Sequence, residues 1–236
     1  MATVTLHHGA LDLPADEVER LADLLAPDEH TRAARYRFPR DRRRFIVRRA
    51  RLRQCLAAET GIAPEALAFV EGPFGKPALA DGPAFSLSYS GEHWALAIAD
   101  APVGVDIEQV DPAVDHRGIA ADLFAPRESA TLAALPEARA LRAFFDCWVR
   151  KEAFVKAIGQ GLFYPLDAFE VSVEGAARLN AGGEGWAMRE FALAEGVAGA
   201  VAAGDDGQAL TVSLYDFDAR GMADEIRAFS PAPSAA

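Results

Sequence analysis

Three acidic side chains and one lysine interrupt segments of this sequence that are otherwise largely apolar. Asp106 and Glu108 lie in the run GVDIE, and Glu152 and Lys156 lie in the run WVRKEAFVK. Carboxylates that share one space repel each other unless water or a cation neutralises them. Mg²⁺ is held in proteins by one or two carboxylates together with phosphate oxygens. If the two segments meet, these residues could bind a metal ion and a phosphate group.

The first pair of carboxylates falls in a predicted strand over residues 103–110. Side chains alternate along a strand, so Asp106 and Glu108 point to one face while Val105 and Ile107 point to the other. The two carboxylates would lie about 7 Å apart along the strand. A half-exposed strand with its polar face in water would produce the same pattern, so this segment alone leaves both interpretations open.

The second pair falls in a predicted helix over residues 137–158. Glu152 and Lys156 are four residues apart and therefore share one stripe of that helix. A Glu–Lys pair on a solvated face stabilises a helix by about 0.2–0.5 kcal/mol and needs no function. Because the rest of the helix is mostly apolar, we favour a stripe that opens into a cleft. Glu152 could then join Asp106 and Glu108 on a metal, with Lys156 near a phosphate oxygen.

The elements that must position these residues occur in the same order in both halves of the 236-residue chain. Each half has a strand, two short helices, a long helix and three strand-like runs. They are expected at 2–7, 14–25, 28–37, 40–60, 67–72, 84–90 and 93–100, and then at 103–110, 115–122, 126–135, 137–158, 168–173, 186–193 and 197–204.

This repeat predicts an α+β fold of two similar α/β halves, each with a long helix packed on a small, mainly antiparallel sheet. The expected division is 1–102 and 103–228, followed by a disordered tail at 229–236. A monomer with internal pseudo-twofold symmetry would place a ligand cleft where the halves meet.

Charge is distributed unevenly along the chain. The net charge is −11, yet residues 32–53 hold 11 arginines against one acid, Asp41, which gives this stretch about +10. A basic patch on an acidic protein favours a specific anionic partner over general binding of nucleic acid.

The compartment is predicted from the cysteines and the apolar segments. Cys55 and Cys147 both fall in apolar helical patterns, which favours buried free thiols in a reducing compartment. We see no signal peptide and no apolar run of the roughly 20 residues that a membrane span needs. A cytoplasmic protein without a membrane segment is therefore expected.

The joint order and spacing of these motifs resemble the 4′-phosphopantetheinyl transferase family. GVDIE and, about 40 residues later, WVRKEAFVKAIGQGL are similar to its motifs G-[IV]-D-[IVL]-E and [FW]-x-x-K-E-[AS]-x-x-K. FGKPAL resembles the family's G-K-P turn, and FSLSYSGEHWALAIA resembles its F-N-[IL]-S-H-S-G segment. The arginine-rich stretch resembles its basic N-terminal helical region. The length and the two halves are similar to the larger, surfactin-type class.

This resemblance implies transfer of 4′-phosphopantetheine from coenzyme A to a serine of an apo acyl or peptidyl carrier protein, with Mg²⁺ and release of 3′,5′-ADP. The implied metal ligands are Asp106, Glu108 and Glu152. The residues implied to contact coenzyme A are Arg32, Lys76, Ser88, Tyr89 and Lys156. Asp106, Glu152 and Lys156 would be catalytic, and we prefer Glu152 as the general base for the carrier serine, acting directly or through a water.

The sequence departs from the family pattern at two positions. Tyr89 stands where the family usually has histidine, and Gln160 stands in place of a frequent lysine. Lys151 and Glu128 match family positions, but the sequence assigns neither of them a role. Another Mg²⁺-dependent phosphotransfer enzyme, or a non-enzymatic module that binds nucleic acid through the arginine-rich helix, are the alternatives. The carrier protein that is served stays open.

Overall fold

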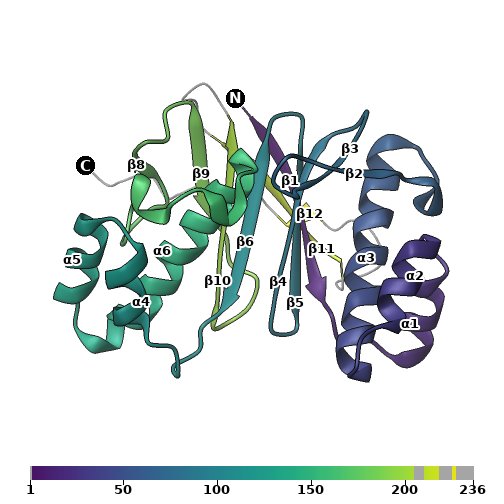
Figure 1. Ribbon diagram of the computed structural model, residues 1–236, viewed down its shortest axis with the longest axis horizontal. Helices are drawn as coiled ribbons and strands as arrows, with labels where there is room; N and C mark the ends of the chain where they lie inside the picture. Colours follow the sequence, from purple (N-terminus) through teal and green to yellow (C-terminus); the bar gives the residue numbers. More distant parts are fainter. Residues whose placement is uncertain (1, 205–209, 218–224, 227–236) are drawn as a thin grey trace.

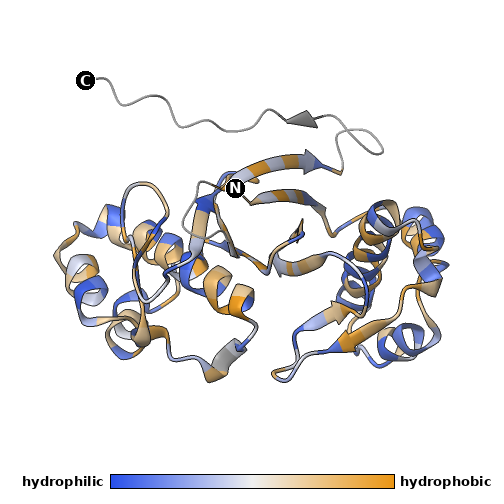
Figure 2. Ribbon diagram, turned by 90° about the horizontal axis from the view of Figure 1, so that it is seen from above, coloured by the Kyte–Doolittle hydropathy of each residue, from blue (hydrophilic) through white to orange (hydrophobic). Residues whose placement is uncertain are grey.

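A computed structural model of the chain describes residues 2–204, 210–217 and 225–226. Helices lie at the two outer sides of the molecule, and two β-sheets pack against each other between them (Figure 1). The view from above shows the same arrangement, with the strands between the two groups of helices (Figure 2). The fold is therefore α+β, as predicted.

The first sheet has five strands in the order β12-β11-β1-β5-β4. Its neighbours are antiparallel except for β1 and β11, which run parallel. The bounds are Thr3–Ala10 (β1), Ala84–Ser90 (β4), His93–Ala99 (β5), Thr211–Asp216 (β11) and Glu225–Ile226 (β12).

The second sheet is smaller and antiparallel, in the order β6-β10-β9. Two short ribbons, β2 with β3 and β7 with β8, lie outside both sheets. The bounds are Phe69–Glu71 (β2), Pro77–Leu79 (β3), Val103–Gln109 (β6), Glu170–Val171 (β7), Leu179–Ala181 (β8), Trp186–Glu190 (β9) and Val197–Gly204 (β10).

Each helical group contains two short helices and one long helix. The bounds are Ala15–Ala22 (α1), Pro27–Ala34 (α2), Pro39–Thr60 (α3), His116–Leu123 (α4), Pro126–Ala134 (α5) and Glu137–Ile158 (α6). Both long helices end at a glycine in the left-handed conformation, Gly61 (φ 70°) and Gly159 (φ 73°). A residue with a side chain adopts that conformation at a cost, so these glycines fix the helix ends.

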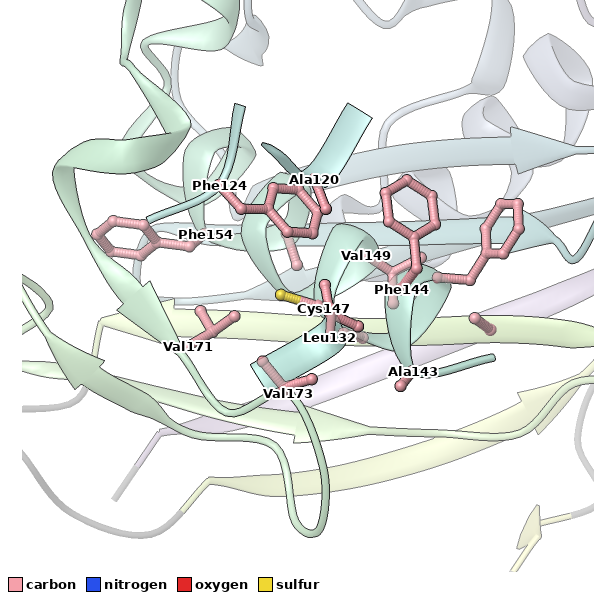
Figure 3. Packing of buried hydrophobic residues seen from close by; sticks show 14 of the residues in the cluster. Ala120, Phe124, Leu132, Ala143, Phe144, Cys147, Val149, Phe154, Val171 and Val173 are labelled. Carbon is pink, nitrogen blue, oxygen red and sulfur yellow. The ribbon is translucent and has the colours of Figure 1, made fainter. Parts of the chain in front are cut away.

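Apolar side chains form three buried clusters that follow the layers. One lies between α1–α3 and the first sheet, the second lies between the two sheets, and the third surrounds α6. Strand alternation separates the clusters: on β5, Leu96 faces α3 whereas Ala97 faces the second sheet. Phe124, Phe154 and Cys147 belong to the third cluster (Figure 3). This packing holds α6 against β6 and β10.

Most expected elements are present close to their expected bounds. The short strands β3, β8 and β12 were not anticipated, and neither was β11. Its sequence TVSLYD alternates polar and apolar residues, as half-buried strands do. It continues the first sheet beside β1, although it belongs to the second half of the chain. The boundary between 1–102 and 103–228 and the pseudo-twofold symmetry therefore stay predictions. The expected tail at 229–236 lies outside the described residues.

Two smaller expectations concern the cysteines and the membrane. Cys55 and Cys147 are buried free thiols, as predicted. Within the described part of the chain, no helix combines the length and the apolar character that crossing a bilayer requires.

Candidate active site

Asp106 lies on β6 where the two sheets meet, and two polar side chains converge on it. Its Oδ1 accepts hydrogen bonds from the Ser88 hydroxyl on β4 (2.8 Å) and from the Lys156 ammonium on α6 (2.6 Å). Its other oxygen, Oδ2, is buried and has no hydrogen-bond partner among the described residues. Burial raises the pKa of Asp106, although the Lys156 charge opposes that shift. A buried, unpaired carboxylate oxygen calls for a ligand that can satisfy it.

Two further carboxylates lie close to Asp106. Oε2 of Glu108 accepts a hydrogen bond from the Ser90 hydroxyl (2.7 Å), and Glu152 lies half-buried on α6. Burial raises the pKa of both carboxyls, and the negative charge of Asp106 raises both further. The three groups are therefore near enough to repel one another. As predicted, Val105 and Ile107 lie on the opposite face of β6, in the cluster between the sheets.

Small residues allow α6 to approach the strand that carries these acids. A Cβ atom on Gly104 would collide with the backbone oxygen of Ala153 and the backbone nitrogen of Ala157. On the neighbouring strand β10, the residues that face α6 are all alanines, at positions 198, 200 and 202. Because these positions have little or no side chain, Glu152 and Lys156 come within reach of Asp106.

The three carboxylates have the donor chemistry of a site for a hard divalent cation. Asp106 Oδ2 is unpaired, and Glu108 Oε1 accepts no hydrogen bond from the described residues. However, as placed, no group of three His, Cys, Asp or Glu side chains in residues 2–204, 210–217 and 225–226 could hold a metal ion. The residues fit Mg²⁺ by chemistry, but as placed the three side chains do not converge on one cation.

The structure shows what Lys151 and Glu128 do, which the sequence alone left open. Lys151 is 0% exposed, and its ammonium lies 2.7 Å from Oε2 of Glu128. The ammonium also donates to the backbone oxygens of Leu166 (2.6 Å) and Phe169 (2.9 Å). Glu128 accepts from the backbone N–H of Ala125 and Val171. This buried ion pair ties α5, α6 and the segment after α6 together and does not reach the carboxylate cluster.

Lys76, a predicted contact of coenzyme A, lies in the turn between β2 and β3. Its ammonium donates to the backbone oxygens of Val103 (2.8 Å) and Ala157 (3.4 Å), and burial lowers its pKa to about 8. Nearby, the rings of Phe74 and Phe163 meet with their centroids 5.5 Å apart. The β2–β3 turn therefore bridges from the first half of the chain to the end of α6.

Arg32 and Tyr89, also predicted to contact coenzyme A, lie outside the cluster formed by Ser88, Asp106 and Lys156. Arg32 is exposed on α2 and lies over the Phe45 ring at 5.5 Å. Tyr89 is half-exposed on β4, with the Arg48 guanidinium 3.9 Å from its ring centroid.

Several arginines of helix α3 form ion pairs within the protein. Arg49 and Arg53 both pair with the buried Glu29 of α2, and Arg51 pairs with Glu17 of α1 at 2.7 Å. These contacts fasten α1 and α2 to α3. Within the basic stretch 32–53, the exposed arginines are at positions 32, 35, 37, 40, 42 and 43, and Arg40 pairs with Asp41 (3.5 Å).

A recess of about 550 Å³ opens beside Glu108. Ser90, Phe145 and Val114 contribute to its lining, so Glu108 can be reached from outside. A larger cavity of about 970 Å³ lies along the other side of α6, near Arg150 and Phe191, and none of the carboxylate cluster lines it. Because one acid of the cluster, Glu108, lines the smaller recess, that recess is the better candidate for an approach to the site.

Comparison with known proteins identifies the family. Residues 102–202 match the family described as the 4′-phosphopantetheinyl transferase superfamily. The chain is 36% identical over 170 residues to 4′-phosphopantetheinyl transferase HetI of Nostoc sp., covering 69% of this chain and 71% of that protein. It is 34% identical over 167 residues to 4′-phosphopantetheinyl transferase psf-1 of Bacillus pumilus, with coverage of 69% and 71%.

A more distant relative and one solved structure were also matched. The 4′-phosphopantetheinyl transferase Sfp of Bacillus subtilis is 29% identical over 161 residues, with coverage of 67% of this chain and 71% of that protein. Among solved structures, holo-[acyl-carrier-protein] synthase of Thermotoga maritima aligns with 44% of this chain and 63% of its own at a TM-score of 0.36 and 20% identity. A superposition this loose supports no conclusion.

The matched region contains Asp106, Glu108, Glu152 and Lys156. Sequence reasoning missed Ser90, which holds Glu108; the alternation of β4, with Ser88 two residues earlier, was the available signal. The extent and identity of the match to HetI show that the chain is an enzyme of the 4′-phosphopantetheinyl transferase family.

Proposed function

We propose that the protein transfers 4′-phosphopantetheine from coenzyme A to a serine of an apo acyl or peptidyl carrier protein, with Mg²⁺, and releases 3′,5′-ADP. The observation that carries this proposal is the meeting of Asp106, Glu108, Glu152 and Lys156 where β6 and α6 lie together. Phosphoryl-group transfer depends on charge neutralisation and alignment, and these side chains supply both.

In this proposal Asp106, Glu108 and Glu152 hold the metal ion. When bound, Mg²⁺ supplies positive charge beside the pyrophosphate oxygens and offsets the repulsion among the three carboxylates. The unpaired Oδ2 of Asp106 supports this role, because it is a buried acceptor with no partner among the described residues. Burial raises the pKa of all three carboxyls, and the Lys156 charge only partly opposes that shift.

The carrier serine would attack the phosphorus that bears the pantetheine group. A bond forms between the serine oxygen and that phosphorus, and the bond from this phosphorus to the bridging oxygen breaks, so 3′,5′-ADP leaves. Glu152 is our proposed base for the serine proton, acting directly or through a water, because a carboxylate in this cluster can accept that proton. Lys156, already 2.6 Å from Asp106, would stabilise the charge on the leaving phosphate.

Contacts to coenzyme A remain proposals for Arg32, Lys76, Ser88, Tyr89 and Lys156. Among these, the Lys76 ammonium and the Ser88 hydroxyl already have protein partners, so a role toward the nucleotide requires them to share or exchange those bonds. We also propose that the enzyme acts as a cytoplasmic monomer. The particular carrier protein is not assigned.

The proposal is tested by incubating the protein with coenzyme A, Mg²⁺ and several apo carrier proteins, and then weighing each carrier by mass spectrometry. We expect a mass gain equal to one phosphopantetheine group and release of one 3′,5′-ADP per carrier. Absence of this gain on every carrier would refute the transfer.

Two controls separate the metal role from the transfer. Excess chelator should abolish the gain, and added Mg²⁺ should restore it. Asp106→Ala should abolish the gain although the protein remains folded by circular dichroism. Transfer that persists in chelator or in this variant would overturn the metal assignment and leave the transferase intact.

A further inference from the structure

The two sheets meet along β4 and β6, which are edge strands of different sheets and are not paired with each other. Serine hydroxyls on β4 take the place of the missing backbone carbonyls. Successive serines of one strand face accept hydrogen bonds from alternate N–H groups of β6: Ser86 from Val105 (3.1 Å), Ser88 from Ile107 (3.4 Å) and Ser90 from Gln109 (3.0 Å). We call these three contacts the serine ladder.

Two serines of the serine ladder, Ser88 and Ser90, also hydrogen-bond a carboxylate. Ser88 donates its hydroxyl proton to Asp106 (2.8 Å), and Ser90 donates its proton to Glu108 (2.7 Å). A hydroxyl has one proton and two lone pairs, so it can donate to an acid and still accept an N–H. For Ser86, the corresponding residue of β6 is Gly104, which has no side chain to accept a hydrogen bond.

In both carboxylates the serine occupies only one oxygen. Asp106 uses Oδ1 and Glu108 uses Oε2, and neither Oδ2 nor Oε1 accepts a hydrogen bond from the described residues. A carboxylate held through one oxygen has a restricted side chain and presents the other oxygen in a defined direction. Partners of this kind orient metal ligands and raise metal affinity.

We propose that Ser90 is a positioning residue that holds Glu108 by Oε2 and so prepares Oε1 to ligate a divalent cation. This inference rests on the proposed function, because it assumes that Glu108 is a metal ligand. Ser88 is the less suitable residue to test, since its hydroxyl also contacts Lys156 (3.1 Å). Among the described residues, the Ser90 hydroxyl hydrogen-bonds only Glu108 and the N–H of Gln109.

Within the serine ladder, Ser86 provides a matched control for substitution of Ser90. Ser90→Ala removes one hydrogen bond between the strands and the contact with Glu108, and Ser86→Ala removes only a bond between the strands. Binding of Mg²⁺ and Mn²⁺ to the full chain would be measured by isothermal titration calorimetry, with and without coenzyme A. We expect about 10–100-fold weaker binding for Ser90→Ala, and wild-type binding for Ser86→Ala. Ser90→Thr keeps the hydroxyl and should restore the affinity.

Kinetics give a second readout. The KM for coenzyme A of Ser90→Ala should match the wild type at saturating Mg²⁺, while the Mg²⁺ concentration needed for half-maximal transfer should rise by the same factor as the dissociation constant. A purely structural role would lower the yield of folded protein for both serine variants and leave the metal dependence unchanged.

The outcomes separate this inference from the proposed function. If the wild type binds metal and Ser90→Ala binds it equally well, the inference is wrong and the metal site stands. If Ser86→Ala weakens binding as much as Ser90→Ala, the effect belongs to the joint between the sheets, and the inference is also wrong. If the wild type binds no divalent cation with or without coenzyme A, the metal role fails and the inference fails with it.

Discussion

The ammonium of Lys156 and the carboxylate of Asp106 form an ion pair, with Nζ 2.6 Å from Oδ1, between the last turn of α6 and the middle of β6. Asp106 is buried, whereas the Lys156 side chain is 30% exposed. The pair therefore joins α6 to the strand that carries two of the acids, and it leaves one carboxylate oxygen of Asp106 without a partner among the described residues.

Lys156→Met is expected to lower the free energy of unfolding by about 1–3 kcal/mol, less than the loss for a fully buried pair, because water already screens part of the lysine charge. It leaves a buried carboxylate without its counter-charge. The double variant Lys156→Met/Asp106→Asn should recover most of this loss, since no charge remains to be buried. Urea unfolding measures both, and equal losses for the single and double variants would contradict the argument.

Lys151→Met should lower the free energy of unfolding by more, about 3–5 kcal/mol. It leaves Glu128 charged in a site where both side chains are almost fully enclosed. Pairing it with Glu128→Gln should reduce the loss, although the backbone oxygens of Leu166 and Phe169 still lack their donor. The double-mutant cycle by chemical denaturation gives the coupling energy. Additive losses would show that the two groups do not interact.

Gly104→Ala should displace α6 from β6, because the added Cβ meets backbone atoms of Ala153 and Ala157 that cannot rotate away. Overpacking of this kind typically costs about 1–3 kcal/mol, and a collision with backbone lies at the upper end. The rate of transfer should fall even under conditions where the variant remains folded, since Glu152 and Lys156 move with the helix. Gly175→Ala is a useful control at a glycine with open space around its Cβ position, where the cost comes from its positive φ. Retained transfer in Gly104→Ala would contradict the prediction.

The carboxylate cluster should make the folded protein less stable as pH rises through the acidic range. Burial raises the pKa of Glu152, and Asp106 and Glu108 raise it further, so the folded state binds this proton more tightly than the unfolded state. The resulting stabilisation is present below the ordinary glutamate pKa and is lost as pH rises through the raised value. Glu152→Gln should therefore melt at a higher temperature than the wild type at pH 7.5 and show no such advantage near pH 4.

Saturating Mg²⁺ should reduce the advantage of Glu152→Gln at pH 7.5, because the cation relieves the same repulsion in the wild type. Differential scanning calorimetry at both pH values, with and without the ion, provides the comparison. A wild type that is the more stable protein at pH 7.5 without metal would show that the cluster is not strained.

Lys76 should titrate near pH 8, because burial lowers its pKa to about 8 from 10.5. Between these two values the unfolded chain holds the proton that the folded chain has lost, so the share of stability from Lys76 rises with pH across this window. With only three lysines in the chain, ¹³C-methylated protein gives a resolvable NMR titration. A midpoint near 10.5 would contradict this, and Lys76→Met identifies the resonance.

Local sequence patterns predicted the long helices well because their ends are set by nearby residues, Gly61 and Gly159. Alternation along β6 likewise predicted that Asp106 and Glu108 share a face. The role of Lys151 could not be predicted in this way. It is adjacent to Glu152, yet it points into the core toward Glu128, and that contact depends on where α5 packs. The assignment of metal ligands stays a prediction, because Asp106, Glu108 and Glu152 do not yet converge on one point.

The parallel pairing of β1 with β11 has a consequence for synthesis of the chain. Thr3 lies opposite Thr211, so β1 is synthesised more than two hundred residues before the strand that pairs with it. Until then β1 can pair only with β5, and its other edge presents unpaired backbone groups to any extended peptide nearby. A nascent chain stalled before residue 211 therefore exposes an unpaired strand edge. Removal of β11 should cause the protein to aggregate, and not merely to lose activity while it stays folded. The order of synthesis, and not only the final contacts, makes this late strand necessary.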